Sequence, residues 1–379
     1  MVAQNSVYGW FFYGPFKINS LSLVAVDVDE KTRESNEVCV QLKKFWETEE
    51  ISNNSVLSEE DKFCEDLFAK TTFRREDGRY VVKLPFRPEF PKAIFLSASR
   101  YQAKKQYIHM EMKLGRKMDL LNIYNSILNE YIDLGHMQKC NSIEISKYGK
   151  YFSYYLPHHA VFRPESASTK VRVVFNGSRK TQSSYTLNDV LYSVPTLQSD
   201  LMTIILNWRK YKYVFNGDIE KMYRQIMIND SDRPYQRILF RNINTGDIED
   251  YELATVTFGI NLPTLLQLAD DTEKYNPLSS RILRNETYVD DVLSGGHTLE
   301  SAIESQNQLC SALYSAGFPL KKITANHPRL LEQIPKENLL NDDFLKFDDS
   351  SSTKTLGIRW NAMTDTFSYK IEKMCGETF

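Results

Sequence analysis

Cysteine is scarce in this chain of 379 residues, and its spacing follows no known pattern. The five cysteines are scattered, and no two of them form a CxxC motif: Cys39, Cys64, Cys140, Cys310 and Cys375. Zinc modules need clustered thiolates and disulfide frameworks need paired ones, so neither is expected. The scatter instead favours a reducing compartment.

Long apolar runs are also absent. No stretch approaches the ~20 apolar residues that span a bilayer, and the start of the chain lacks the basic region and apolar core of a signal peptide. The formal net charge is -2, which does not by itself indicate a nucleic-acid binder, so any basic surface has to be local. The sequence therefore predicts a soluble, intracellular protein.

Aromatic residues, in contrast, are abundant. The chain has 22 Tyr and 21 Phe, in a composition that is 42% hydrophobic and 25% charged. Such a composition is typical of a globular protein rather than of a disordered one. The rings can form cores, and some of them can serve as stacking surfaces for nucleic-acid bases.

Two adjacent carboxylates, Asp290 and Asp291, lie within the β-favouring segment Thr287–Leu293. This pattern predicts a β-hairpin with the acid pair at its tip, followed by Gly295-Gly296, where the chain is free to bend. The two charges repel unless a cation lies between them and a third acid. That is the plan of a two-metal site for phosphoryl transfer. For the tetrapeptide alone, an exposed Asp-Asp turn is an equally good explanation.

Asp218 is the natural third acid. It stands at the end of a strand predicted at residues 211–217, after an amphipathic helix at 197–209, and a helical turn is expected to follow at 219–226. The hairpin of the acid pair and this strand can lie side by side in one antiparallel sheet.

Two cations, Lys170 and Arg172, fall on one face of a strand predicted at residues 169–175. They suit an anion such as a triphosphate, because Arg donates in a bidentate fork. An exposed polar face explains them equally well. The adjacent His158 and His159 are not expected to share a metal ion, since neighbouring side chains on a strand point to opposite faces.

The remaining pattern predicts alternating helices and hairpins. Ser58 has the character of a helix N-cap, and the spacing of apolar residues indicates continuous helix over residues 99–134. Further elements are expected as a hairpin at 235–241 and 250–258, a helix at 299–316 and a hairpin at 355–360 and 366–369.

Taken together, these motifs resemble the reverse transcriptase region of Pao (BEL/Pao) retrotransposons. The matching stretches cover most of the chain: Gln4–Trp10, Arg79–Phe86, Leu156–Ser178, Leu187–Leu191, Gly217–Arg241, Tyr288–Gly295 and Thr353–Trp360. The resemblance implies an α+β polymerase right-hand fold with fingers and palm, an antiparallel palm sheet with flanking helices, and a partial or absent thumb.

The resemblance also implies a domain order. Residues 1–60 would be the tail that follows a lost protease domain, plus a linker, and 61–150 a helical N-terminal extension of the fingers. Residues 151–300 would form the fingers and palm of the reverse transcriptase, and 301–379 the end of the palm and the start of a thumb-like region. No Asp-Thr/Ser-Gly protease motif is present, and the family's RNase H and integrase regions would follow beyond this chain.

By the same resemblance, Asp218, Asp290 and Asp291 are the catalytic acids, and they hold two Mg²⁺ ions, or Mn²⁺, together with the backbone carbonyl of Ile219. Lys170 and Arg172 would hold the nucleotide triphosphate. Tyr223 would lie under the incoming sugar and exclude a 2′-hydroxyl. The implied reaction is nucleotidyl transfer from dNTPs to a primer 3′-hydroxyl on an RNA or DNA template, in the cytoplasm or in virus-like particles.

Two departures from the family keep alternatives open. The family has Phe-Asp-Ala-Ser where this chain has Phe175-Asn-Gly-Ser178, and the segment after Gly259 is shorter than in the family. The first alternative is therefore a catalytically degenerate relic that binds nucleic acid without polymerising. The second is a structural or interaction protein in which the acids form a surface turn; the order of Asp218, Tyr223 and the acid hairpin argues against it.

Overall fold

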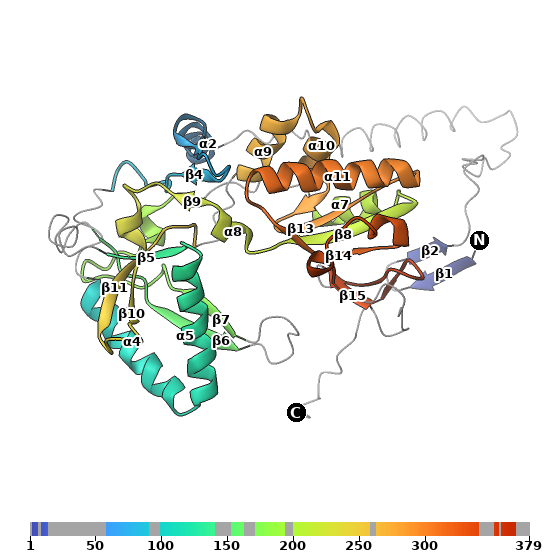
Figure 1. The fold of residues 1–379 in the computed structure, drawn as a ribbon. Coiled ribbons are helices and arrows are strands. Elements are labelled where there is room, and N and C mark those ends of the chain that lie inside the picture. Colours follow the sequence, from blue (N-terminus) through green and yellow to red (C-terminus); the bar gives the residue numbers. More distant parts are fainter. Residues whose placement is uncertain are drawn as a thin grey trace, which may run out of the picture. The chain divides into compact units, whose positions relative to one another are not determined.

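The computed structural model describes residues 2–6, 9–13, 58–90, 99–140, 153–162, 171–193, 200–257, 263–340, 352–355 and 358–368. The chain is a mixed α+β protein with several small sheets (Figure 1). It divides into two compact units, Met1–Val56 and Leu57–Phe379. In the first unit, β1 (Val2–Ser6) and β2 (Gly9–Tyr13) pair as antiparallel strands. The second unit contains all the other elements, so the divisions expected at residues 150 and 300 stay predictions.

The central sheet of the larger unit has four antiparallel strands. In spatial order they are β12 (Thr287–Tyr288), β13 (Asp291–Gly296), β8 (Tyr213–Ile219) and β14 (Leu320–Ala325). Successive side chains of a strand point to opposite faces, and the two faces belong to different cores. Phe215 and Val292 contribute to the main core, whereas Val214 and Leu293 contribute to a smaller one.

Helix α11 (Leu299–Ser315) covers the main-core face of this sheet, as Figure 1 shows. Its first turn is fixed by a capping box, in which the hydroxyl of Thr298 accepts a hydrogen bond from the Ser301 amide at 3.1 Å. Helices α9 (Thr264–Thr272) and α10 (Pro277–Asn285) pack against each other and against α11. The helix predicted at 299–316 is thereby confirmed.

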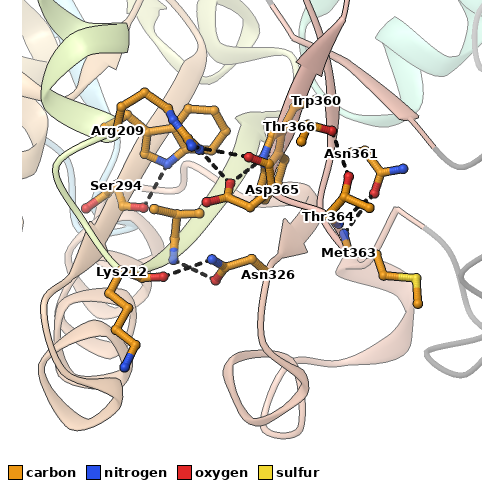
Figure 2. A network of polar contacts seen from close by, with 12 residues as sticks. Arg209, Lys212, Ser294, Asn326, Trp360, Asn361, Met363, Thr364, Asp365 and Thr366 are labelled. Atoms are coloured by element: carbon orange, nitrogen blue, oxygen red, sulfur yellow. Dashed lines mark hydrogen bonds and ion pairs between the residues drawn. The ribbon is translucent and has the colours of Figure 1, made fainter. Parts of the chain in front are cut away.

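Helix α7 (Leu201–Trp208) and the C-terminal strands build the smaller core on the opposite face. The strands are β15 (Ser352–Thr355), β16 (Ile358–Asn361) and β17 (Thr366–Ser368), which pair in that order. The rings of Trp208 and Trp360 meet edge to face with centroids 4.7 Å apart. Figure 2 shows the polar contacts around them: Trp208 donates to the Ser294 carbonyl, and Asp365 accepts from both Arg209 and Trp360.

Three further small sheets and two long helices form the other side of the unit. The sheets are β5 (Met137–Lys139) with β11 (Ile248–Leu253) and β10 (Arg237–Arg241), β6 (His158–Phe162) with β7 (Val171–Phe175), and β3 (Phe73–Arg74) with β4 (Tyr80–Val82) and β9 (Met227–Ile228). The helices are α4 (Arg100–Gly115) and α5 (Met118–Asp133). Helix α4 packs against β10 and β6, and α5 packs against β7 and β5.

The expectation of unbroken helix over residues 99–134 was wrong. Helix α4 ends at Gly115, and Lys117 leaves the helical region with φ −135° and ψ 79° before α5 begins. Glycine is a poor helix former, and here it marks the C-terminal end. The N-cap role expected for Ser58 is confirmed at the start of α2 (Glu59–Thr71), where it forms a capping box with Asp61. None of the helices within the described residues is long and apolar enough to cross a membrane.

Candidate active site

Asp218 and Asp291 lie directly opposite each other on neighbouring strands of the central sheet. The register of β8 and β13 pairs these two residues, and the register of β12 and β13 pairs Tyr288 with Asp291. Asp290 therefore stands at the tip of a tight hairpin. The tip is tied to the end of β8, because the Ile219 amide donates a hydrogen bond to the Asp290 carbonyl at 2.7 Å. The predicted hairpin and the predicted neighbourhood of the three acids are both confirmed.

The two paired acids share the face of the sheet that α11 does not cover. Asp291 alternates in phase with Leu293, and its partner Asp218 alternates in phase with Val214, so both acids point to the side of the smaller core. All three acids are partly buried. Asp218 and Asp291 thus lie on the sheet face that α7 and the smaller core share, opposite α11.

The backbone around the acids is strained at several positions. Val289, which precedes the acid pair, has φ +54°, a left-handed conformation that a β-branched residue adopts rarely. Lys221 and Lys322 also have positive φ values, at +51° and +52°. Strained residues of this kind persist where the surrounding structure holds them in place, and they cluster at functional sites.

Negative charge accumulates at this site. Burial raises the pKa of Asp290, and Asp218 raises it further. Burial, followed by the charges of Asp290 and Asp218, raises the pKa of Asp291 to about 7. The ammonium of Lys322 acts in the opposite direction on both aspartates without cancelling the rise. For Asp290 and Asp291, burial and the neighbouring carboxylates together therefore outweigh the attraction of the nearby cations.

Lys322 is a residue of this site that the sequence did not predict. Its Nζ forms an ion pair with Oδ2 of Asp218 at 2.6 Å. The register between β14 and β8 shifts between Lys321 and Thr324, and this bulge re-aims the Lys322 side chain. Lys321, the neighbour in register with Asp218, instead donates to Asn338 at 2.6 Å. The only sequence signal was the Lys-Lys pair in an otherwise apolar segment.

Two of the predicted nucleotide-binding residues lie within electrostatic range of the acids. Tyr223 is half-buried on the short helix α8 (Met222–Gln225), and its pKa is raised by burial and then by the charge of Asp290. Arg172 is exposed on β7, and its charge lowers the pKa of Asp290. Lys170 lies outside the described residues.

The two adjacent histidines of β6 point to opposite faces of the strand, as expected. His158 is buried and its Nε2 bonds the Leu239 carbonyl at 2.8 Å, whereas His159 is exposed. Burial lowers the pKa of His158 to about 4.

Arg224 is a second residue that the sequence reasoning missed. It follows Tyr223, and its guanidinium lies over the rings of Tyr131 and Phe175, at 4.6 and 5.2 Å from their centroids. Burial lowers the pKa of this guanidinium. Lys221 forms an ion pair with Glu130 of α5. The turn that carries Tyr223 is therefore fixed to α5 and β7 by cation–π contacts and one ion pair.

The donor set suits magnesium in kind. Mg²⁺ prefers carboxylate and carbonyl oxygens, and the site offers the carboxylates of Asp218, Asp290 and Asp291 and the nearby backbone of Ile219. Even so, within the described part of the chain no group of three or more His, Cys, Asp or Glu side chains is arranged closely enough to hold a metal ion. Asp218 is paired with Lys322, so its carboxylate would have to change partner before it could bind a metal.

Comparison with known proteins adds no further identification: neither a protein-family model nor a curated protein sequence matches this chain.

Proposed function

We propose that this chain is an RNA-directed DNA polymerase of the reverse transcriptase type, similar to those of Pao elements. The observation that carries the proposal is the placement of Asp218 opposite Asp291 on adjacent strands, with Asp290 at the hairpin tip between them. The polymerase right-hand fold is part of the proposal. In it, the central sheet is the palm, and β6–β7, the β5–β11–β10 sheet, α4 and α5 are the fingers.

The three aspartates are proposed to hold two Mg²⁺ ions, with the Ile219 carbonyl as a further ligand. When bound, these ions supply the Lewis-acid stabilisation that the attacking and leaving oxygens of a phosphoryl transfer require. Burial, and then the charges of Asp290 and Asp218, disfavour ionised Asp291, and a bound cation would offset both effects. Lys322 holds Asp218 in an ion pair, and it would have to give up this contact if the carboxylate were to bind a metal ion.

The remaining residues act on the substrates. Arg172, together with Lys170, would neutralise the triphosphate of the incoming dNTP. The half-buried Tyr223 would occupy the space of a 2′-hydroxyl and so select deoxynucleotides. Its neighbour Arg224 fixes the turn by stacking on Tyr131 and Phe175. The template–primer, of RNA or DNA, supplies sequence information by base pairing, so the protein needs only backbone contacts to it. Cytoplasmic location, within virus-like particles or free, belongs to the same proposal.

Primer extension tests this proposal directly. The parent chain is incubated with an RNA template, a labelled DNA primer, dNTPs and Mg²⁺ or Mn²⁺, beside Asp290→Asn and a matched control, Asp247→Asn, in an exposed turn. We expect extension by the parent and the control, and none by Asp290→Asn.

A folded parent chain that retards a primer–template duplex but never extends it would overturn the catalytic proposal. The alternative would then hold, namely a nucleic-acid-binding relic. The observation that favours this alternative is the ion pair of Asp218 with Lys322, because it occupies one of the three acids.

A further inference from the structure

A second concave site lies on the small β3–β4–β9 sheet, on elements that carry none of the three acids. It is a hollow of about 400 Å³, lined on one side by Phe73, Arg75 and Val81 and on the other by Asn229, Asp230 and Arg233. None of these residues is among the predicted site residues, and the proposed polymerase chemistry does not use them.

The first wall presents an exposed ring beside a loosely held cation. Phe73 is 52% exposed, although it stands in a strand and opposite the buried Val81. Arg75 follows, and its Nε lies 3.9 Å from Asp77. That carboxylate is already bound to Arg79 at 2.8 Å. The guanidinium of Arg75 therefore retains donors for another anion.

The second wall adds fixed donors. Arg233 is held by Asp230 at 2.7 Å and by the Ile228 carbonyl at 3.2 Å, with its side chain only 13% exposed. The carbonyl oxygen of the Asn229 side chain accepts from Ser231, so its amide hydrogens remain for a ligand. Two guanidiniums and one carboxylate give the hollow a net charge of one positive unit.

The hollow is also preorganised. Between Phe73 and Val81 the chain turns at Gly78, where φ is +86° and an added Cβ would lie 2.1 Å from the Ser315 carbonyl. Nη2 of Arg74 donates to the same carbonyl at 2.6 Å. The turn is thus fastened to the end of α11, the helix that covers the face of the central sheet opposite Asp218 and Asp291. A binding site that is already rigid loses little entropy when its ligand arrives.

We propose that this hollow binds one nucleotide unit of single-stranded nucleic acid, with the base stacked on Phe73 and the phosphate between Arg75 and Arg233. Base–aromatic stacking tolerates any base, and arginine is the preferred partner of phosphate. The inference rests on the proposed function only for the identity of the strand, which would be a part of the template that lies outside the active site.

Equilibrium binding in EDTA tests the site without any catalysis. The fluorescence anisotropy of a short labelled oligothymidine is measured with the parent, Phe73→Ala, Phe73→Trp and Arg75→Ala over a range of salt concentrations. We expect Phe73→Ala to weaken binding about tenfold, through loss of one stacking contact, while Phe73→Trp retains it. Arg75→Ala should reduce the slope of log affinity against log salt by about 0.7, the value for one phosphate contact with a single strand.

The matched control is Tyr275→Ala, which removes another aromatic ring that is 74% exposed. Because Phe73 and Arg75 are exposed, their variants are expected to keep the parent's circular dichroism spectrum. Parent-like affinity in both Phe73→Ala and Arg75→Ala would overturn the proposal. Competition by free thymidine monophosphate that matches the oligonucleotide at equal nucleotide concentration would assign the hollow to mononucleotides, and would overturn the assignment to a strand.

The two proposals fail separately. Asp290→Asn should abolish primer extension and leave oligothymidine binding in EDTA unchanged. A parent that extends no primer, but loses strand binding on Phe73→Ala, refutes the polymerase and keeps the site.

Discussion

In two regions of this protein, the pKa of a partly buried aspartate is shifted in opposite directions. In the β5–β11–β10 sheet, Asp250 accepts two hydrogen bonds of 2.7 Å from Arg100. Burial alone would raise the pKa of Asp250, but the bonds from Arg100 and Tyr155 outweigh it and hold the pKa below its usual range. On the central sheet, Asp291 has no such partner among the described residues, and its pKa rises to about 7.

The difference separates a carboxylate that stabilises the fold from one that costs stability. Asp250 is ionised and paired, so its charge favours the folded state. Ionisation of Asp291 lowers the stability of the fold, because burial and two neighbouring carboxylates oppose its charge. Groups kept in such an unfavourable state are typical of sites that bind or react. This contrast would distinguish the acid hairpin from an ordinary surface turn.

The largest expected difference between Asp291 and Asp250 is in their effect on catalysis. Asp291→Asn should lower dNTP incorporation about a hundredfold or more. It removes one proposed carboxylate ligand of the metal ions that would stabilise the charge of the transition state. Asp250→Asn should keep near-parental incorporation when assayed well below its melting temperature. Single-turnover primer extension measures both. Equal losses in the two variants would show that the chemistry does not depend on the acid hairpin in particular.

Next in size is an effect on metal affinity. Lys322→Met removes the cation that holds Asp218, so Mg²⁺ or Mn²⁺ should bind about tenfold more tightly, since a nearby unit charge opposes a divalent ion by more than ~1 kcal/mol. Isothermal titration of the metal measures this. The matched control is Lys321→Met, whose Nζ contacts Asn338 instead. If the affinity of Lys322→Met equals that of the control, Lys322 does not compete for the acid.

A smaller effect concerns the stability contributed by ion pairs of the β5–β11–β10 sheet. Arg100→Ala should cost about 1–2 kcal/mol of unfolding free energy, because it strips a mostly buried carboxylate of its main partner. Lys139→Ala breaks a more exposed pair with Glu249 and should cost about 0.5 kcal/mol. Urea denaturation monitored by tryptophan fluorescence compares the two. A larger loss for Lys139→Ala would contradict the ranking.

The smallest effect is a pH dependence with a definite sign. The pKa of Asp291 is higher in the folded than in the unfolded protein, so its contribution to stability is present below the unfolded pKa of about 4 and is lost as pH rises towards 7. The lowered pKa of Asp250 acts oppositely: its contribution is present above about pH 4 and is lost at lower pH. In EDTA, Asp291→Asn should raise the melting temperature at pH 8 by about 2–4 °C and flatten its decline between pH 5 and 8. Differential scanning fluorimetry would show no such flattening if Asp291 were ordinarily hydrated.

The acid hairpin could be predicted because its signals are local. Thr287–Leu293 combines β-favouring residues with two turn-forming acids, and Asp218 comes directly after the apolar segment predicted as a strand at residues 211–217. Such patterns depend only on neighbours in the chain. The exact pairing of Asp218 with Asp291 depends on strand register, which the packing of both faces decides.

Other features of the site could not be predicted, because they depend on contacts between residues that are far apart in the sequence. Lys322 reaches Asp218 only because β14 contains a bulge, and no residue pattern encodes that bulge. The cation–π contacts of Arg224 require that Tyr131 of α5 and Phe175 of β7 pack next to each other in the fold. The break after Gly115 was visible as a glycine, but the apolar spacing on both sides outweighed it in the prediction.

The packing of Trp208 against Trp360 in the smaller core affects how the chain folds while the ribosome synthesises it. Arg209, beside Trp208, and Asp365 of the C-terminal hairpin are 156 residues apart in the sequence. At ribosomal rates of roughly 5–20 residues per second, the apolar face of α7 waits about 10–30 s for the strands that cover it. During that time, Trp208 is exposed on the nascent chain, and Leu293 adds to this apolar surface once it has been synthesised, so this face is where a chaperone would be needed most.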